Sequence, residues 1–483
     1  MLAPTVRPAR IQMQIVPSTA LAFLMLLMLA IKGPYRGLWV FLAATPFGAA
    51  AAFNLPAAGG ASILVSDLGA LMLFALLWVQ PDAPNRLVGT MRAYQPGFWM
   101  LLLVVVCVVS ALFYPRLFQG ATSVFGLSRV NNATGIVEVP LHATNGNLTQ
   151  LFRIMLDAAA FFALATVFRL RPDGDRVLTA IAVATFVNVG LGWLDVLTAA
   201  AGQPKALDVI RTANYAILAG DKMVGIKRMV GGFPEASAFG YYTLGLFGFW
   251  LHMWLVQGRS RRTGWALFLT TVALLRSTSS SAYVSAVVFL VGYAAVRIAS
   301  GGGRTVSRRA VGVSVAAVGA VLMAGVALAV CYAVLPPVTA FLDRALFDKM
   351  GTSSGVERMS WNTQAWANFI DTWGVGAGLG SMRASNWVLA SLGSIGFIGT
   401  SIFLALVAAM AWLPARAETD AGRAAVIGAL KSGCLALFVS AMLTAPTPDL
   451  GMLFFAMAGL ATGLSRGAAR ESSKAEMWRR VAD

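Results

Sequence analysis

The sequence predicts an all-α polytopic membrane protein with about 12–13 membrane-spanning helices and large external loops. Of its 483 residues, 58% are hydrophobic and only 12% are charged. About a quarter of the residues in a soluble globular domain are charged, so this composition excludes that class. Apolar runs of about twenty residues, long enough to cross ~30 Å of hydrocarbon as helices, recur along the whole chain. These runs do not alternate in polarity, as membrane-spanning strands would.

Thirteen apolar segments are expected to build one transmembrane helical domain over residues 1–465. They are 14–31, 37–53, 62–80, 97–114, 149–168, 177–200, 236–257, 263–277, 280–299, 311–335, 387–413, 424–444 and 449–465. Pro46 and Pro56 interrupt the run 37–60, which is interpreted either as a crossing or as a re-entrant element. If the run is a re-entrant element, the chain crosses the membrane twelve times and both termini lie in the cytoplasm. The first segment is followed by Lys32 and Arg36 rather than by a cleavage site, so no cleaved signal peptide is expected.

The connections between these segments are of two kinds. Short basic connections are expected to face the cytoplasm, and so is the basic tail 466–483, which we expect to be disordered. The long connections, at about 115–150, 202–235 and 336–386, then lie on the opposite side. The net charge of +17 is attributed mainly to cytoplasmic loops, so no nucleic-acid partner is predicted.

The external connections carry cations on the side where the orientation rule disfavours them. The 202–235 connection has five, which are Lys205, Arg211, Lys222, Lys227 and Arg228. One interpretation is a site for an anionic, lipid-borne substrate such as a diphosphate, because the arginine fork matches phosphate oxygens. The alternative is that long external loops simply escape the orientation rule.

The stretch 353–399 is a polar, glycine-punctuated insert between apolar runs. Ser354 and Glu357 form a capping-box pattern, and apolar residues at helical spacing predict an amphipathic helix over about 355–371 that rests at the membrane surface. Gly374, Gly376, Gly378 and Gly380 then predict a turn with free N–H groups, which favour an anion. Arg358 and Arg383 flank this turn, and Asn386 opens the next helix. The alternative is that these arginines are solvated and the glycines serve close packing.

Other ionisable residues lie within or beside the apolar runs. Arg153 and Asp157 are four residues apart and are predicted to neutralise each other inside the bundle. Arg276 precedes a serine cluster, and Glu235 begins a helix after Arg228 and two glycines. Glu235 is interpreted either as a favourable charge at a helix start or as a base for an acceptor hydroxyl. Three cysteines and two histidines show no metal-ligand spacing, so no metal site is predicted.

Three stretches together resemble the O-antigen polymerase and O-antigen ligase superfamily of bacterial envelope membrane proteins. They are Arg228 with the following Gly-Phe-Pro-Glu-Ala-Ser-Ala, the turn Arg276-Ser-Thr-Ser-Ser-Ser-Ala, and Glu357-Arg358 with the later Trp-Gly-Val-Gly-Ala-Gly-Leu-Gly-Ser. The resemblance covers roughly residues 200–400. It implies a GT-C-like, metal-independent glycosyltransferase of the bacterial inner membrane whose active site faces the periplasm. Such enzymes use undecaprenyl diphosphate-linked glycans and need no nucleotide cofactor.

The resemblance leaves two activities open. A polymerase moves a growing glycan onto the next lipid-linked repeat unit, and a ligase moves the finished glycan onto lipid A-core. Ligases typically carry a histidine where this chain has Ser385, so polymerase is the preferred interpretation. Glu235 replaces the asparagine of many relatives, which favours an exopolysaccharide-type polymerase. A chain-length regulator and a flippase are the expected protein partners.

The corresponding mechanism is an inverting transfer in which the protein positions the reactants and stabilises charge. Arg228, Arg276 and Arg358 are expected to hold the diphosphate, and Glu235 to act as general base. Additional residues predicted to bind the diphosphate are Arg211, Arg383, Gly376, Gly378, Gly380 and Asn386. A rival hypothesis is a transporter or flippase of lipid-linked sugars, although the chain lacks the internal repeats common in transporters. A third hypothesis is that the protein is a purely structural membrane partner of an export complex.

Overall fold

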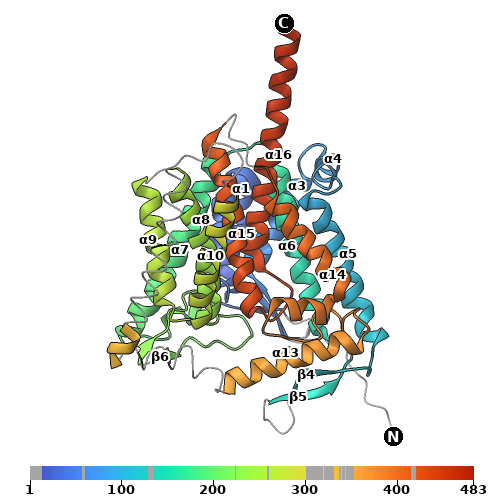
Figure 1. Cartoon of the computed structure of the whole chain (residues 1–483), viewed down its shortest axis with the longest axis vertical. Coiled ribbons are helices and arrows are strands. Elements are labelled where there is room, and N and C mark those ends of the chain that lie inside the picture. Colours follow the sequence, from blue (N-terminus) through green and yellow to red (C-terminus); the bar gives the residue numbers. More distant parts are fainter. Residues whose placement is uncertain are drawn as a thin grey trace.

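A computed structural model describes residues 13–56, 60–128, 135–223, 225–257, 260–300, 353–414 and 420–482, together with positions 319, 331–336, 339 and 343. The described chain is mostly helical (Figure 1). Its helices are α1 (Thr19–Arg36), α2 (Leu38–Ala44), α3 (Val65–Trp78), α4 (Ala83–Val88), α5 (Pro96–Leu117), α6 (Asn145–Leu170), α7 (Gly174–Ala200), α8 (Ala236–Val256), α9 (Arg261–Arg276), α10 (Ser280–Ser300), α13 (Ser353–Asp371), α14 (Trp387–Ala411), α15 (Ala421–Thr444) and α16 (Gly451–Ala482).

Seven of these helices are long and apolar enough to cross a membrane, as expected for a polytopic membrane protein. They are α1, α5, α6, α7, α10, α14 and α15. The thirteen segments of the sequence exceed this number because α2, α3 and α9 have fewer than 18 residues, while α8 and α16 are long but less apolar. The segment 311–335 lies almost wholly outside the described residues.

Small residues bring the core helices close together. Helix α16 packs along α6, where a Cβ at Gly459 would lie 2.5 Å from the carbonyl oxygen of Phe161. Helix α15 packs along α8, where a Cβ at Gly245 would lie 2.7 Å from Leu437 Cγ. Close backbone approach at small residues is typical of helix packing in membranes, where van der Waals contact replaces a hydrophobic driving force.

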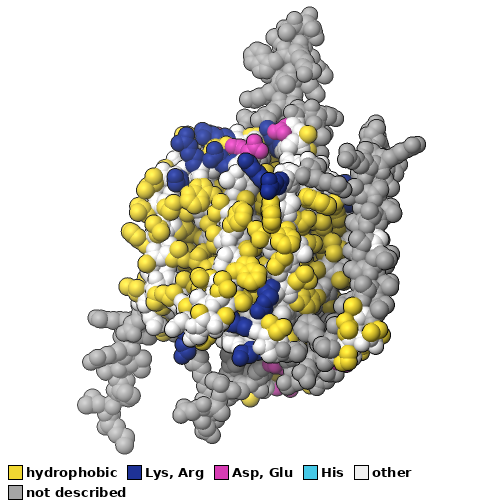
Figure 2. All heavy atoms as spheres, turned by 90° about the vertical axis from the view of Figure 1, so that its left-hand side faces the viewer, with side chains coloured by type: hydrophobic (Ala, Val, Ile, Leu, Met, Phe, Trp, Pro, Cys, Tyr) yellow, Lys and Arg dark blue, Asp and Glu magenta, His cyan; other side chains and the backbone are white. Residues whose placement is uncertain are grey.

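A broad apolar surface covers the face of the bundle that carries α9. Figure 2 shows hydrophobic side chains across the middle of the face that carries α9, with Lys and Arg side chains gathered above and below them. Exposed Trp265 and Phe268 of α9 and Val287 and Val291 of α10 belong to this surface. Such a band between two charged rims is the surface that a lipid bilayer covers.

Three small antiparallel sheets interrupt the helical architecture. The strands are β1 (Gln14–Ile15), β2 (Ala51–Leu55), β3 (Ala61–Leu64), β4 (Ser123–Ser128), β5 (Gly135–Pro140), β6 (Lys222–Met223) and β7 (Ile226–Lys227). They pair in the order β1-β2-β3, β4-β5 and β6-β7. The strict all-α description is therefore corrected for these segments.

The segment 37–53 is not a membrane crossing. Helix α2 ends after seven residues at Ala44, and the chain turns into β2, which pairs with β3. Pro46 breaks the helix, and Gly48 lets the backbone approach Phe233, whose Cδ1 would lie 2.5 Å from an added Cβ. The interpretation of this run as a membrane crossing is therefore wrong, because the chain leaves the helix after seven residues.

The residues of the predicted disordered tail continue α16 as a helix to Ala482, so that prediction is wrong. This segment is rich in Ala, Arg, Glu, Lys and Met, which favour helices in water. Figure 1 shows α16 projecting from the end of the bundle opposite to β4, β5, β6 and α13. The described parts of the three long connections therefore gather at one end of the bundle.

Helix α13 lies across that end (Figure 1). Its buried positions, including Ala365 and Asn368, face β4 and α14. Its exposed apolar residues are Val356, Met359, Trp366, Ile370 and the following Trp373. This division confirms the predicted amphipathic helix, which begins at Ser353 and ends at Asp371.

Candidate functional site

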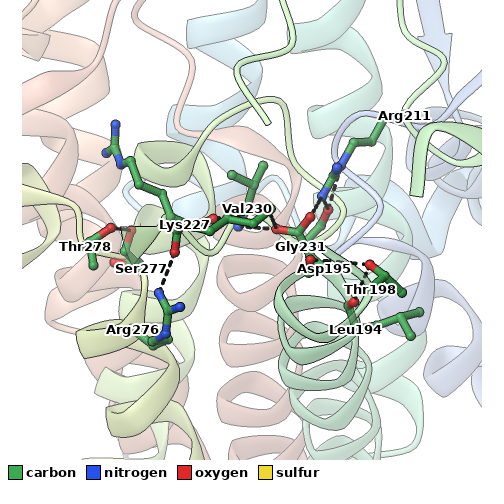
Figure 3. A network of polar contacts seen from close by, with 11 residues as sticks. Leu194, Asp195, Thr198, Arg211, Lys227, Val230, Gly231, Arg276, Ser277 and Thr278 are labelled. Atoms are coloured by element: carbon green, nitrogen blue, oxygen red, sulfur yellow. Dashed lines mark hydrogen bonds and ion pairs between the residues drawn. The ribbon is translucent and has the colours of Figure 1, made fainter. Parts of the chain in front are cut away.

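The 202–235 connection is anchored by one buried carboxylate, Asp195, near the end of α7. Its Oδ1 accepts a hydrogen bond from Arg211 Nη2 at 2.7 Å, and its Oδ2 lies 2.7 Å from Lys227 Nζ. The backbone N–H of Val230 donates to the same carboxylate at 3.0 Å (Figure 3). Two cations and one amide therefore compensate a charge whose side chain is 1% exposed. The connection is held against the bundle at two points of its sequence, Arg211 and 227–230.

Arg211 serves this internal network. It is 4% exposed, and its Nε and Nη2 both donate to the carbonyl oxygen of Gly231, at 2.9 and 2.6 Å. Gly231 has φ +58°, a left-handed conformation that presents this carbonyl to the guanidinium. Nε and Nη2 of Arg211 therefore donate to Gly231 and Asp195 within the protein. The sequence had instead predicted that Arg211 binds the diphosphate.

Arg228 and Arg276 converge on the β6–β7 hairpin. Arg276 at the end of α9 donates from Nη1 to the carbonyl oxygen of Lys227 at 2.6 Å (Figure 3). Arg228 follows Lys227 directly, and its Nη1 lies 3.8 Å from Asp221, whose side chain is 48% exposed. Tyr283 on α10 is within electrostatic range of both guanidinium groups. The sequence-predicted residues Arg228 and Arg276 are therefore brought together.

Neither of these two guanidinium groups is well neutralised. Arg228 Nε is buried and has no hydrogen-bond partner among the described residues. Its ion pair with Asp221 is long and half-exposed, and such pairs contribute little binding energy. Arg276 donates to a carbonyl and makes no ion pair with any described carboxylate. The local surplus of positive charge favours an anion at this position.

The turn between α9 and α10 is strained and rich in hydroxyl groups. Thr278 has φ +49°, which is unfavourable for a β-branched residue. Ser277, Thr278, Ser279 and Ser280 are all buried, and a Cβ at Gly240 would lie 2.7 Å from Ala282. Gly240 thus lets the first turns of α8 approach this hydroxyl-rich turn, next to Arg276.

Glu235 is the N-terminal capping residue of α8. Its Oε1 accepts a hydrogen bond from Ser237 Oγ, and its side chain makes no cap hydrogen bond. Gly231 and Gly232 precede it, and the carbonyl oxygen of Pro234 accepts from the N–H of Leu218 at 2.8 Å. The carboxylate is therefore half-buried, on the same connection as Arg228 and at the start of the helix that packs on the Arg276 turn.

The N–H groups of residues 374–379 in the glycine turn after α13 are not free, which corrects the sequence prediction for this part of the turn. Residues 374–379 all donate N–H hydrogen bonds within the protein, including Ala377 to Gly393 at 2.7 Å and Gly378 to Ser394 at 3.0 Å. The turn fits into a kink of α14 at Gly396, where an added Cβ would lie 2.1 Å from the carbonyl oxygen of Val375.

The glycines of this turn serve close packing. Gly376, Gly378 and Gly380 have φ values of +97°, +104° and +82°. A Cβ at Gly378 would lie 2.5 Å from Pro115 Cγ, and one at Gly380 would lie 2.4 Å from the carbonyl oxygen of Gly146. The turn therefore joins α14 to the ends of α5 and α6, as in the packing interpretation.

The remaining predicted residues flank this turn. Asn386 caps α14, with Oδ1 accepting from the N–H groups of Val388 and Leu389 at 2.9 and 3.3 Å. Arg383 is exposed and stacks 5.8 Å from the centre of the Trp361 ring. Arg358 is half-buried on α13 and makes no ion pair or hydrogen bond with the described residues. The structure places Arg358 at the same end as the hairpin without joining it to Arg228 or Arg276.

A second polar cluster lies inside the bundle, and its pairing differs from the sequence prediction. Asp157 is 3% exposed, and no ion pair joins it to Arg153 among the described residues. The carboxylate with the strongest electrostatic effect on Arg153 is instead Asp67 of α3, and the Tyr215 hydroxyl donates to the carbonyl oxygen of Gly48 at 2.7 Å. Burial raises the pKa of Tyr215 to about 12, so this phenol stays protonated. Chain segments far apart in the sequence thus supplied partners that helical spacing did not identify.

A cavity of about 520 Å³ lies at the opposite end of the bundle, at the start of α7 and α15. Tyr35, Arg171, Asp173, Asp420 and Arg423 are among its lining residues. Burial alone would raise the pKa of Asp173, but hydrogen bonds from the Arg176 amide, Tyr35 and the Arg176 guanidinium lower it overall. This cavity is distant from the predicted diphosphate-binding residues.

The chain matches no protein-family model and no curated protein. Within the residues that the structure describes, no group of three or more His, Cys, Asp or Glu side chains is placed to hold a metal ion. The candidate site is therefore defined by its own chemistry. It consists of the poorly neutralised Arg228 and Arg276, the hydroxyl-rich turn and the carboxylate of Glu235, at the end of an apolar bundle.

Proposed function

We propose that this protein is a polysaccharide polymerase of the bacterial inner membrane. It transfers a growing glycan from undecaprenyl diphosphate onto a lipid-linked repeat unit, with the candidate site facing the periplasm. The observation that carries the proposal is the convergence of Arg228 and Arg276 on the Lys227 backbone without a close carboxylate of their own. The motif resemblance of residues 200–400 is a separate argument for the same activity.

A lipid diphosphate suits this site for two reasons. Guanidinium groups bind phosphate oxygens through paired N–H donors and stay charged at every relevant pH. The site also lies at the end of α9, whose exposed Phe268 and Leu275 are apolar, so a polyprenyl chain can remain in lipid while its diphosphate reaches the arginines. A water-soluble anion would gain nothing from that position.

In the proposed reaction, the bond between the anomeric carbon and the diphosphate oxygen breaks, and the diphosphate leaves with the electron pair. An acceptor hydroxyl oxygen forms the new bond from the opposite face, which inverts the anomeric centre. Glu235 takes the hydroxyl proton, while Arg228 and Arg276 stabilise the negative charge that develops on the leaving diphosphate. Arg358 is a third cation at the same end, supplied by α13.

Other predicted residues have supporting roles in this proposal. Arg211 and Asp195 hold the connection from which Arg228 projects, so they are positioning residues. Gly376, Gly378 and Gly380 shape the joint between α13 and α14 and are not assigned to substrate. Asn386 caps α14, and Arg383 lies exposed on Trp361.

The test replaces Arg228 or Arg276 with lysine in a polymer-producing strain that lacks the chromosomal copy. Lysine keeps the charge and loses the bidentate geometry, so we expect at least a tenfold loss of long glycan, or about 1.4 kcal/mol in the transition state. Gel banding of the glycans is the measurement. Arg116→Lys, at an exposed site at the end of α5, is the matched control and should leave the banding unchanged.

The banding of the strain without the protein separates the rival activities. Single repeat units on the carrier or on lipid support a polymerase. Full-length polymer stranded on the carrier would instead identify a ligase, and absence of external repeat units would identify a flippase. Full-length polymer with both lysine variants would contradict the diphosphate-binding role of the two arginines.

A further inference from the structure

Two cations of the segment 353–399 lie on one face of α13. The guanidinium carbon of Arg383 lies 5.8 Å from the centre of the Trp361 ring. The backbone N–H of Ser385 donates to Asn362 Oδ1 at 2.7 Å, so the chain around Arg383 is held against α13 at two adjacent positions. Arg358 precedes Trp361 by three residues and Asn362 by four, which places it on the same face of the helix. Arg358 and Arg383 therefore carry their charges on one side of α13.

Neither of these guanidinium groups is neutralised by a described carboxylate. The ion pairs among the described residues include neither Arg358 nor Arg383. Glu357 is adjacent to Arg358 in sequence, but neighbouring residues of a helix point about 100° apart. Asp371 accepts a hydrogen bond from Thr122 at 2.7 Å and lies about 20 Å further along the helix than Arg358. This face of α13 therefore has a surplus of positive charge.

The position of this cationic face favours an anion that is carried by a lipid. Helix α13 lies across the end of the bundle (Figure 1), and its exposed Met359 and Trp366 lie on the stripe next to Arg358. Amphipathic helices that carry tryptophan lie at the level of lipid headgroups. Guanidinium groups bind phosphate oxygens through paired N–H donors. The ligand chemistry that fits this face is therefore a lipid phosphate or diphosphate.

The proposed reaction requires a second place for such a group, because both substrates carry a lipid diphosphate. The donor loses its diphosphate as the leaving group. The acceptor keeps its own, since only a sugar hydroxyl of the acceptor reacts. Two diphosphates in one site would repel each other, so each needs its own cations. No contact between described residues joins Arg358 or Arg383 to Arg228 or Arg276.

We propose that Arg358 and Arg383 bind the diphosphate of the acceptor, which is the lipid-linked repeat unit that receives the glycan. This inference rests on the proposed function and assigns its second substrate to a second site. The site only binds, because no bond of the acceptor diphosphate forms or breaks. An anionic phospholipid has related headgroup chemistry and is the alternative occupant that the experiments separate.

The first experiment compares two acceptors in a transfer assay with the purified full-length protein in phosphatidylcholine nanodiscs. One acceptor is the repeat unit on undecaprenyl diphosphate, and the other is the same repeat unit on an uncharged alkyl chain. The lipid-linked repeat unit is the donor in both cases. We expect the wild type to prefer the diphosphate acceptor about tenfold, and the double variant Arg358→Gln, Arg383→Gln to lose this preference. Arg116→Gln, at the exposed end of α5, is the matched control and should keep it.

The ratio of the two products separates this inference from the proposed function. An intact preference in the double variant overturns the acceptor site and leaves glycan transfer in place. Equal loss of transfer onto both acceptors would assign the two arginines to the donor and would also overturn the acceptor site. If the wild type transfers glycan to neither acceptor, the proposed function itself is contradicted, and the inference with it.

The second experiment measures binding of sugar-free undecaprenyl diphosphate to the same nanodiscs. We expect about two molecules per wild-type chain and about one per chain of the double variant. A wild type that binds only one, or displacement of the second molecule by excess phosphatidylglycerol, overturns the proposal. Arg383 is exposed, so Arg383→Gln alone replaces the double variant if that does not fold, and it should weaken the second binding step about tenfold.

Discussion

At the scale of single residues, the role of a cation in this protein depends on its nearest carboxylate. Arg211 and Arg228 both lie in the 202–235 connection and are equivalent by sequence. Arg211 is enclosed with Asp195, whereas Arg228 has only the distant and half-exposed Asp221. The first guanidinium is therefore structural, and the second is left poorly neutralised, as the proposed binding of a diphosphate requires.

Replacing Asp195 with asparagine should destabilise the protein by about 3–5 kcal/mol, because Arg211 becomes a buried charge without a counter-ion. Thermal unfolding of the purified protein measures this effect. Asp208→Asn, in the same connection but exposed, should change stability by less than about 0.5 kcal/mol. Equal midpoints for the two variants would show that the Asp195 network does not hold the connection.

At the scale of elements, the two parts of the polar insert 353–399 have different roles. The glycine turn packs against α14, and α13 is an amphipathic helix. The turn is a packing joint whose N–H groups are consumed by Gly393, Ser394 and neighbouring groups. Helix α13 presents a divided surface. Its exposed apolar residues Met359, Trp366 and Ile370 share one stripe, and the exposed polar residue Ser360 lies beside that stripe.

Because the glycine turn is closely packed, adding a single methyl group to it is expected to lower the stability of the protein strongly. Gly378→Ala should cost at least about 2 kcal/mol, because φ +104° strains an L-residue and the new Cβ would meet Pro115 at 2.5 Å. The thermal midpoint of unfolding is the readout. Gly190→Ala in α7 is the matched control, since an added Cβ there meets nothing within 4 Å and alanine is the better helix former.

The divided surface of α13 predicts that one flank touches lipid. A fluorophore attached at Ile370→Cys should be quenched by nitroxide-labelled lipids, because tryptophan-rich amphipathic helices lie at the membrane interface. The same fluorophore at Ser360→Cys should be quenched more strongly by a water-soluble quencher. Identical quenching at the two positions would mean that α13 does not lie along the bilayer.

At the scale of the whole molecule, connections of different length lie at opposite ends of the bundle. Helix α16 projects from one end, and β4, β5, β6 and α13 lie at the other (Figure 1). Because short basic connections tend to remain in the cytoplasm, the end with α13 is proposed to face the periplasm.

Cysteine labelling of intact cells tests this orientation. We expect a membrane-impermeant maleimide added to cells with a permeabilised outer membrane to modify Lys205→Cys, at the α13 end, at least tenfold faster than Arg261→Cys, at the start of α9. Both positions are exposed, so accessibility within the protein does not distinguish them. The native cysteines Cys107, Cys331 and Cys434 are replaced by serine in both strains. Faster labelling of Arg261→Cys would place the candidate site in the cytoplasm.

Hydrophobicity and helical spacing correctly predicted most helices, because a membrane span needs a long apolar run and an amphipathic helix needs a periodic one. They also indicated a re-entrant alternative at Pro46. The strands β2 and β3 were missed, since short buried strands have no distinctive periodicity. The helical tail was missed because a basic composition does not exclude a helix.

The candidate site was predicted only in part. Arg228 was identified as a cation where the orientation rule disfavours one, and Arg276 as an ionisable residue beside a serine cluster at the end of an apolar run. The electrostatic pairing of Arg153 with Asp67 was not foreseen, because the two residues are 86 positions apart and spacing on one helix favoured Asp157 instead.

The sequence by itself determined that this protein is a helical membrane protein with cationic connections, since hydrocarbon thickness and the charge of loops act on local composition. Only the tertiary structure decided which cations are neutralised and which N–H groups are free. Those properties depend on Asp195 and Ser394, which reach their partners through packing between distant segments. Partner choice in a low-dielectric interior is a matter of distance in space, which no local pattern encodes.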